Sequence, residues 1–232
     1  MKAVISIVND FIGLIYPNIC ASCGNTLMRN EKVICTICLY ELPRTRFHDD
    51  PENPVSQTFW GRVKVEGATS FFFFTKGSKF RKLIHKLKYK GQKEIGFELG
   101  RHFGAELAQS ESFGKSDVLI PVPLHPKREK KRGYNQSEWI ARGMAETMKI
   151  PVDTVSVYRN IANVTQTTKT RFDRWDNVAD IFSVRNAENL KGKHIILVDD
   201  VVTTGSTLEA CAATILQAGN VRVSIATIGF AS

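Results

Sequence analysis

The sequence lacks several features that mark large classes of proteins. Its 232 residues contain no run of 18 or more apolar residues, so we predict no transmembrane helix and no stable membrane insertion. It has no internal repeat and no low-complexity tract, which argues against a solenoid or a disordered protein. Four of its five cysteines lie between Cys20 and Cys38, unlike the spread of a secreted disulfide scaffold. We therefore expect a protein of the reducing cytoplasm.

The composition is otherwise ordinary, apart from an excess of positive charge. Hydrophobic residues make up 43% and charged residues 24%, as in soluble globular proteins. The net charge of +9 suits anionic ligands such as phosphates, nucleic acid or anionic lipid, although solubility alone would also account for it. Residues 1–15 are apolar with a polar stripe at helical spacing. This pattern predicts an amphipathic structural helix rather than a targeting segment.

The hydrophobic pattern divides the chain into three parts. Residues 1–45 hold the amphipathic helix and the cysteine cluster, residues 46–65 have the composition of a linker, and residues 66–232 form the main domain. In the main domain, strands are predicted at 67–75, 118–122, 154–158, 194–202 and 221–228. Helices are predicted at 79–90, 95–108, 135–148 and 207–217, and a long polar loop at 160–180. This alternation predicts an α/β fold with a parallel sheet flanked by helices.

The most informative stretch begins in the strand predicted at 194–202. It runs Ile195-Ile-Leu-Val-Asp-Asp-Val-Val-Thr-Thr-Gly-Ser-Thr207 and opens the next helix. A helix N-terminus offers unpaired N–H groups, and Gly205 allows close backbone approach, so the loop suits a phosphate. Asp199 and Asp200 would repel a bare phosphate, but they can accept hydrogen bonds from sugar hydroxyls or orient the waters of a divalent cation. The stretch has no Gly-Lys-Ser/Thr, so it is not a Walker loop. We therefore predict a site for a phosphorylated sugar. The hydroxyl donors of this loop are Thr203, Thr204, Ser206 and Thr207.

Two further segments concentrate positive charge. One follows the strand at 118–122, where an open α/β sheet binds its ligands, and its prolines and Gly133 indicate a shaped loop that could hold a diphosphate. The other is the outer face of the helix at 79–90, which is either an exposed basic stripe or a solvated helix face. The cations of the first segment are Lys127, Arg128, Lys130, Lys131 and Arg132, and those of the second are Lys79, Arg81, Lys82, Lys86, Lys88 and Lys90.

The cysteine cluster consists of two C-x2-C pairs, Cys20/Cys23 and Cys35/Cys38. Four thiolates in this arrangement match a tetrahedral zinc site, and because they leave no open position we expect a structural ion. Such a site would tie together only about twenty residues around the cysteines, which form a small zinc ribbon. Removal of the metal is therefore expected to unfold this ribbon and to leave ligand binding in the main domain largely intact. Cys211 has no partner in this pattern and is expected in the core.

Taken together, these motifs resemble those of the ComF family of phosphoribosyltransferase-like proteins. The resemblance covers nearly the whole chain. After the cysteine pairs it includes Lys86-Leu-Lys-Tyr-Lys-Gly91, Pro121-Val-Pro-Leu-His-Pro126, Arg132-Gly-Tyr-Asn-Gln136, then Gln166, Arg171 and Asn177, and finally the phosphate loop. The chain departs from the family pattern at Ile161 and Asn163-Val164, where many relatives have an arginine and a Thr-Pro pair.

The resemblance implies a type I phosphoribosyltransferase fold with a small N-terminal zinc ribbon. It implies binding of phosphoribosyl diphosphate (PRPP) with Mg²⁺, and catalytic roles for Asp199, Asp200 and Arg171, the last in a loop at 165–180 that closes over PRPP. The PRPP-binding residues would be Asp199, Asp200, Thr203, Thr204, Gly205, Ser206 and Thr207. The diphosphate-binding residues would be Pro123, Leu124, His125, Lys127, Arg128, Arg132 and Gly133.

The resemblance also implies a role in DNA uptake during natural transformation, with single-stranded DNA and other DNA-uptake proteins as partners. Three functions stay open at this point. The chain would be a PRPP-binding protein that handles single-stranded DNA, an active phosphoribosyltransferase of nucleotide or amine metabolism, or a PRPP sensor without catalysis. No stretch of the sequence identifies an acceptor substrate.

Overall fold

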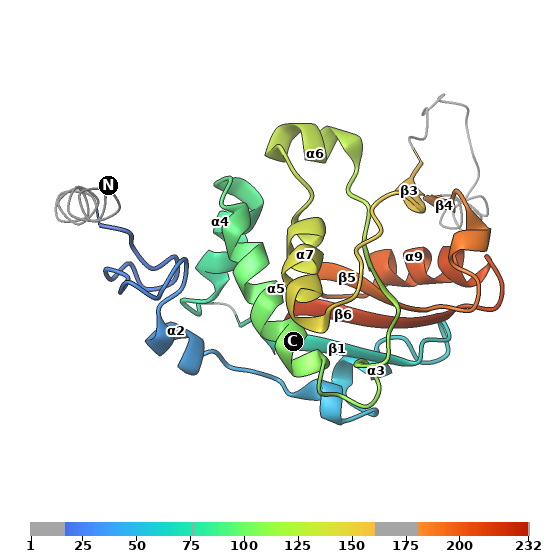
Figure 1. Ribbon diagram of the computed structural model, residues 1–232, viewed down its shortest axis with the longest axis horizontal. Coiled ribbons are helices and arrows are strands. Elements are labelled where there is room, and N and C mark those ends of the chain that lie inside the picture. Colours follow the sequence, from blue (N-terminus) through green and yellow to red (C-terminus); the bar gives the residue numbers. More distant parts are fainter. Residues whose placement is uncertain (1–16, 76, 161–180, 232) are drawn as a thin grey trace, which may run out of the picture.

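The centre of the fold is a sheet of four parallel strands in the order β1-β6-β5-β2 (Figure 1). The computed structural model describes residues 17–75, 77–160 and 181–231. A separate antiparallel pair joins β3 to β4. The parallel sheet confirms the predicted α/β fold. The parallel strands are β1 (Gly67–Phe73), β2 (Val118–Pro121), β5 (His194–Val202) and β6 (Arg222–Phe230), and the pair is β3 (Val157–Arg159) with β4 (Phe182–Val184).

Helices cover both faces of the parallel sheet (Figure 1). The longer ones are α4 (Arg81–Tyr89), α5 (Lys93–Leu107), α7 (Gln136–Met148) and α9 (Ser206–Leu216). The short ones are α2 (Thr36–Tyr40), η1 (Phe47–Asp49), α3 (Pro54–Gln57), α6 (Pro126–Arg132) and η2 (Ala187–Asn189).

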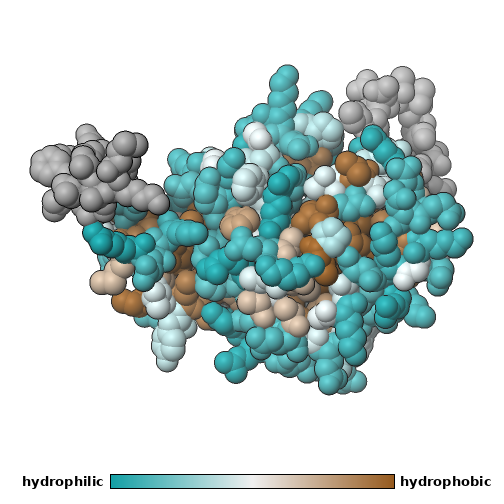
Figure 2. Space-filling view, viewed as in Figure 1, coloured by the Kyte–Doolittle hydropathy of each residue, from teal (hydrophilic) through white to brown (hydrophobic). Residues whose placement is uncertain are grey.

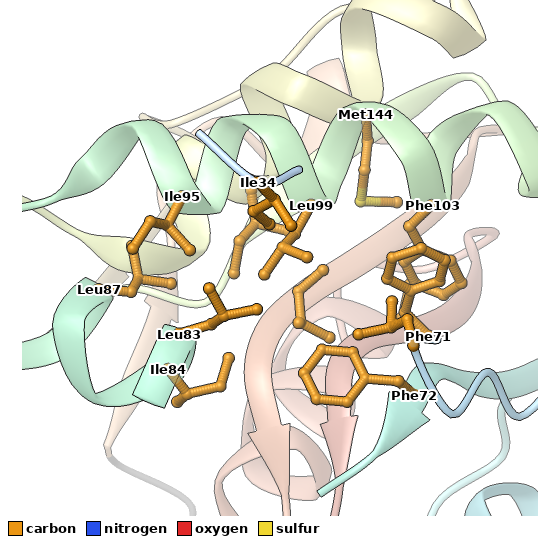
Figure 3. Close-up of a cluster of buried hydrophobic side chains, with 14 of the residues drawn as sticks. Ile34, Phe71, Phe72, Leu83, Ile84, Leu87, Ile95, Leu99, Phe103 and Met144 are labelled. Carbon is orange, nitrogen blue, oxygen red and sulfur yellow. The ribbon is translucent and has the colours of Figure 1, made fainter. Parts of the chain in front are cut away.

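The two faces of the sheet bury separate hydrophobic clusters. Successive side chains of a strand point to opposite faces, so Ile196 and Val198 of β5 pack with α4, α5 and α7, while Ile195 and Leu197 pack with α9. Figure 3 shows the first cluster, in which leucines of α4 meet α5 and the phenylalanines of β1. A central strand buried on both faces explains why residues 194–202 form a continuous apolar run.

Helices α5 and α7 approach each other through glycines. A Cβ added at Gly100 would lie 2.1 Å from the carbonyl oxygen of Ile140, and one at Gly143 would lie 2.0 Å from that of Phe97. In the sequence the glycines of residues 95–108 only weaken the predicted helix. In the fold they let two helix backbones come into contact, which fixes the position of α7.

The N-terminal segments pack into these same clusters. Ile34, Cys38 and Leu42 belong to the cluster that contains α4 and α5. Figure 3 shows Ile34 in this cluster. In the segment with linker-like composition, Val55 and Phe59 are fully buried against the other face of the sheet. Asn53 caps α3 and donates a hydrogen bond to the carbonyl of Ala68 in β1, which anchors this segment to the sheet.

Most predicted elements of the main domain lie close to their expected positions, with two differences. The strand expected at 154–158 lies at Val157–Arg159, and the basic segment expected as a loop contains α6. The helix expected at 1–15 and the loop from residue 161 onward fall outside the described residues. Within the described ranges, no helix is long and apolar enough to cross a membrane.

Candidate functional site

The acid pair lies near the carboxyl end of β5, where two other elements reach it. Ser137, in the first turn of α7, donates a hydrogen bond of 2.8 Å to Oδ1 of Asp199. The backbone amide of Asp200 donates to the same oxygen at 2.8 Å. Lys88 of α4 places its Nζ 2.9 Å from Oδ1 of Asp200. The two carboxylates are therefore held by separate partners and point to separate neighbours.

Burial changes the acid–base behaviour of Asp199. Desolvation, assisted by the negative charge of Asp200, raises the pKa of Asp199 to about 7. The hydrogen bond from Ser137 and the charge of Lys88 act in the opposite direction. Asp199 therefore changes its charge near neutral pH, and a bound cation or a donating hydroxyl would favour its ionised form.

The hydroxyl loop connects β5 to α9. Its four hydroxyl residues, at positions 203, 204, 206 and 207, are exposed, and Thr204 Oγ1 lies 3.2 Å from Ser206 Oγ. Gly205 precedes α9 with a φ of 74°, a left-handed conformation that favours glycine. The loop thus presents hydroxyls together with the first amides of an eleven-residue helix, an arrangement that suits a phosphate.

A residue that the sequence motifs did not indicate supports this loop from behind. Arg62 donates from Nη1 to the carbonyl of Thr204 at 2.8 Å and to that of Thr58 at 3.0 Å, and it forms an ion pair with Glu209 of α9. A Cβ at Gly205 would lie 2.9 Å from Cγ2 of Thr58. The segment around residues 58–62 therefore fixes the backbone path of the hydroxyl loop and lies in close contact with it.

A cavity of about 490 Å³ is lined by cations, one of which contacts the acid pair. Lys88 belongs to both, since it pairs with Asp200 and lines the cavity. Arg132 lies over the ring of Tyr89, 5.4 Å from its centroid, and donates to Gln136 at 2.6 Å. The first contact joins α6 to α4, and the second joins α6 to α7. The lining residues are Lys88, Tyr89, Gly91, Arg128, Lys131 and Arg132.

The residues expected to bind diphosphate are divided by the fold. Arg128 and Arg132 line the cation cavity, whereas Pro123 and Leu124 line a second cavity of about 500 Å³ together with Tyr158 and Arg159. The remaining three serve α6. His125 caps this helix by accepting from the amide of Lys127 at 3.1 Å, Lys127 is exposed, and Gly133 ends it with a φ of 82°. Arg171 lies outside the described residues.

The predicted basic stripe on α4 is wrong in part, because three of its lysines have partners. Lys79 pairs with Glu41, Lys86 donates to the carbonyl of Ala21 at 2.8 Å, and Lys88 pairs with Asp200. With these partners in the ribbon and in β5, the three side chains are only partly exposed. The cations that remain exposed are Arg81, Lys82 and Lys90.

The four ribbon cysteines converge at one point. Their sulfur atoms all lie within 4.8 Å of one another, and only Cys23 is exposed. Burial acts to raise the pKa of Cys20, but hydrogen bonds from backbone amides, among them that of Cys35, lower it to about 6. A thiolate at this position fits a metal ion, so these four residues can hold one.

Comparison with known proteins finds one matching domain and several relatives. Residues 128–230 match the family described as phosphoribosyl transferase domain. The chain is 32% identical over 146 residues to DNA utilization protein YhgH of Shigella flexneri, covering 62% of this chain and 63% of that protein. It is 32% identical over 130 residues to competence protein F of Haemophilus influenzae, covering 54% and 57%. It is 26% identical over 202 residues to competence protein ComFC of Bacillus subtilis, covering 87% and 73%. The chain thus contains a match to a phosphoribosyl transferase domain and is similar to competence and DNA utilization proteins.

The matched domain covers only part of the candidate site. The matched domain begins in α6 and includes the acid pair and the hydroxyl loop, while Lys88 and Arg62 precede it. The match to the YhgH protein spans about 63% of the length of that relative.

Proposed function

We propose that the chain binds PRPP with Mg²⁺ at the carboxyl ends of β2 and β5, and that through this site it acts in DNA uptake during natural transformation. The observation that carries the proposal is the meeting of three features at one edge of the sheet. The hydroxyl loop directly follows the acid pair in the chain, and Lys88 joins the acid pair to the cation cavity. These features match, in order, a 5-phosphate, a ribose and a diphosphate.

Each part of PRPP has a partner of suitable chemistry. The 5-phosphate would accept hydrogen bonds from the hydroxyl loop and the amides of α9. The ribose hydroxyls would donate to Asp199 and Asp200. The diphosphate would enter the cavity lined by Lys88, Arg128 and Arg132, with Mg²⁺ neutralising part of its charge.

Zinc is the metal that we assign to the ribbon. Four thiolates leave no open coordination position, so the ion is structural and activates no water. Cysteines that bind a metal and form no disulfide suit the reducing cytoplasm.

The role in DNA uptake draws support from the relatives and from charge. The relatives carry the names DNA utilization protein and competence protein. Exposed cations lie on α6 and α4, and Figure 2 shows hydrophilic side chains over α6. Single-stranded DNA would bind them weakly, without sequence preference and with a steep dependence on salt. Other DNA-uptake proteins are further partners under this proposal.

The decisive experiment is calorimetric titration with PRPP and Mg²⁺. Asp199→Asn combined with Asp200→Asn should weaken binding by at least about 2 kcal/mol, roughly thirtyfold, because charge-assisted bonds to the ribose are lost. Asp49→Asn is the matched control, since this exposed carboxylate borders a cavity at the amino end of β1. Equal affinity of the double variant and the control would remove PRPP from this site.

A DNA test uses cations that lie outside the PRPP cavity. Lys82→Glu, Lys90→Glu and Lys130→Glu together should abolish binding of a single-stranded oligonucleotide at low salt and leave PRPP affinity unchanged. Undiminished DNA binding by this triple variant would exclude these surfaces. Absence of DNA binding by the wild type at low salt would end the proposal of direct DNA handling.

One observation favours the transferase as a second candidate. The cavity of about 500 Å³ lined by Leu124, Tyr158 and Arg159 gives an acceptor space beside the carboxyl end of β2. A transferase releases diphosphate from PRPP only when an acceptor is present, whereas a sensor binds PRPP and leaves it intact. Screening acceptor bases for diphosphate release separates the two.

A further inference from the structure

The cysteine ribbon is fastened to α4 at three places. Lys86 Nζ donates to the carbonyl of Ala21, next to the predicted metal ligand Cys20, at 2.8 Å. Lys79, just before α4, pairs with Glu41 at the end of α2. Between these contacts, Ile34 of the ribbon and Leu83 of α4 belong to one buried cluster (Figure 3).

The opposite side of α4 reaches the proposed PRPP site. Lys88, two residues after Lys86, contacts Asp200 at 2.9 Å and lines the cation cavity. The carbonyl of Leu87 accepts a hydrogen bond from the hydroxyl of Tyr134, which lies just before α7. A single turn of helix thus carries contacts to the ribbon, to α7 and to the acid pair.

Helix α4 depends on these contacts because its own sequence supports it weakly. It has nine residues, and no side chain caps its N-terminus. Its first turn contains Arg81 and Lys82 and no acidic residue, so two cations face the positive end of the helix dipole. Helices this short are marginal without packing, so the contacts to the ribbon, together with packing against α5, set where α4 lies.

We infer that the metal-holding ribbon positions Lys88 in the PRPP site, with Lys86 as the positioning residue that transmits the constraint. This inference rests on the proposed function. The turn that offers the Ala21 carbonyl lies between the metal-site residues Cys20 and Cys23. The amide of Ala21 donates a hydrogen bond to the carbonyl of Val33 on the other side of the ribbon. Loss of the metal would free this turn, so Lys86 would lose the carbonyl that accepts its hydrogen bond. The position of Lys88 relative to Asp200 would then no longer be fixed. The expectation that metal removal leaves PRPP binding intact is therefore replaced by its opposite.

Calorimetric titration of the full chain with PRPP and Mg²⁺ tests the inference. Lys88→Met should weaken binding about tenfold or more, because a charged partner of the site is lost. Lys86→Met, which touches no part of the site, should weaken it about threefold to tenfold, and Lys86→Arg should restore most of the affinity. Lys82→Met is the matched control, because this lysine lies exposed on the same helix, and it should have no effect.

A double variant distinguishes positioning from general damage. If Lys86 acts through Lys88, then Lys86→Met should add little in the Lys88→Met background, whereas independent effects would multiply. Removal of the metal with a chelator should likewise cost the wild type about tenfold and the Lys88→Met protein much less. Thermal unfolding of each sample, compared with Lys82→Met, confirms that the fold is retained.

The outcomes separate this inference from the proposed function. If the wild type does not bind PRPP at all, the proposed function fails. If the wild type binds, but Lys86→Met and Lys82→Met bind equally well, the positioning role of Lys86 is refuted. Because Lys86→Met leaves every cysteine in place, this comparison holds even where the metal-free protein unfolds.

Discussion

A methyl group added at Gly205 should damage both the stability of the fold and the proposed PRPP site. The backbone there has a φ of 74°, which costs an alanine about 1–2 kcal/mol. Its Cβ would also lie 2.9 Å from Cγ2 of Thr58 and 3.0 Å from Cε1 of Phe59. Phe59 is fully buried, so the neighbours cannot simply move away, and such overpacking costs about 1–3 kcal/mol more. We therefore expect Gly205→Ala to lower the free energy of unfolding by about 2–5 kcal/mol.

Gly219→Ala provides the matched control. Its φ is 78°, but nothing lies within 4 Å of the added Cβ, so only the backbone cost of about 1–2 kcal/mol applies. Urea denaturation measures the free energy of unfolding of both variants. Titration with PRPP should show weaker binding for Gly205→Ala alone, because only this variant displaces the hydroxyl loop. Combining Gly205→Ala with Thr58→Ser should recover part of the loss. The serine removes Cγ2, while its hydroxyl can keep the bond to the carbonyl of Pro54. Equal destabilisation by the two alanines would refute the contact between the loop and residues 58–59.

Three further predictions concern charge and metal. PRPP affinity should be about tenfold lower at pH 6 than at pH 8, because Asp199, with its pKa of about 7, is mostly protonated at the lower pH. Titrations of Asp199→Asn at both pH values should no longer show this tenfold difference. Metal analysis of protein purified without added zinc should find one zinc per chain, and Cys23→Ser should reduce that content; four free thiols without metal would contradict the ribbon assignment. Arg62→Met should weaken PRPP binding about threefold to tenfold, because the Thr204 carbonyl loses its donor. Glu209→Gln should have a smaller effect, since it leaves both carbonyl bonds of Arg62 in place. Similar titration curves for the two variants would exclude a role of Arg62 in holding the hydroxyl loop.

The central part of the site could be predicted because it is continuous in sequence. Residues 194–207 combine an apolar strand, an acid pair, a glycine and hydroxyls, and each feature has a local physical meaning. The strand appears in the fold with the expected bounds, since burial on both faces requires an unbroken apolar run. The cysteine spacing similarly predicted a cluster that the fold brings together.

The partners of that central part could not be predicted, because they come from distant segments. Arg62 and Thr204 are 142 positions apart, and no local pattern links them. Lys88 and Lys82 look alike in the sequence, since both lie off the apolar face of α4. Only the packing of α4 between the ribbon and β5 gives Lys88 a carboxylate and leaves Lys82 in solvent. The composition of residues 46–65 likewise gives no sign that Phe59 is buried behind the hydroxyl loop.

The backbone contact between α5 and α7 makes the proposed PRPP site sensitive to substitutions far from it. Gly143 lies six positions beyond Ser137 on the same helix, and any side chain there would push α7 off the carbonyl of Phe97. Such a displacement would lengthen or break the hydrogen bond between Ser137 and Asp199. A screen for temperature-sensitive loss of PRPP binding should therefore recover alleles at Gly100 and Gly143. Their defect would be a misplaced hydroxyl in a protein that still folds at the permissive temperature.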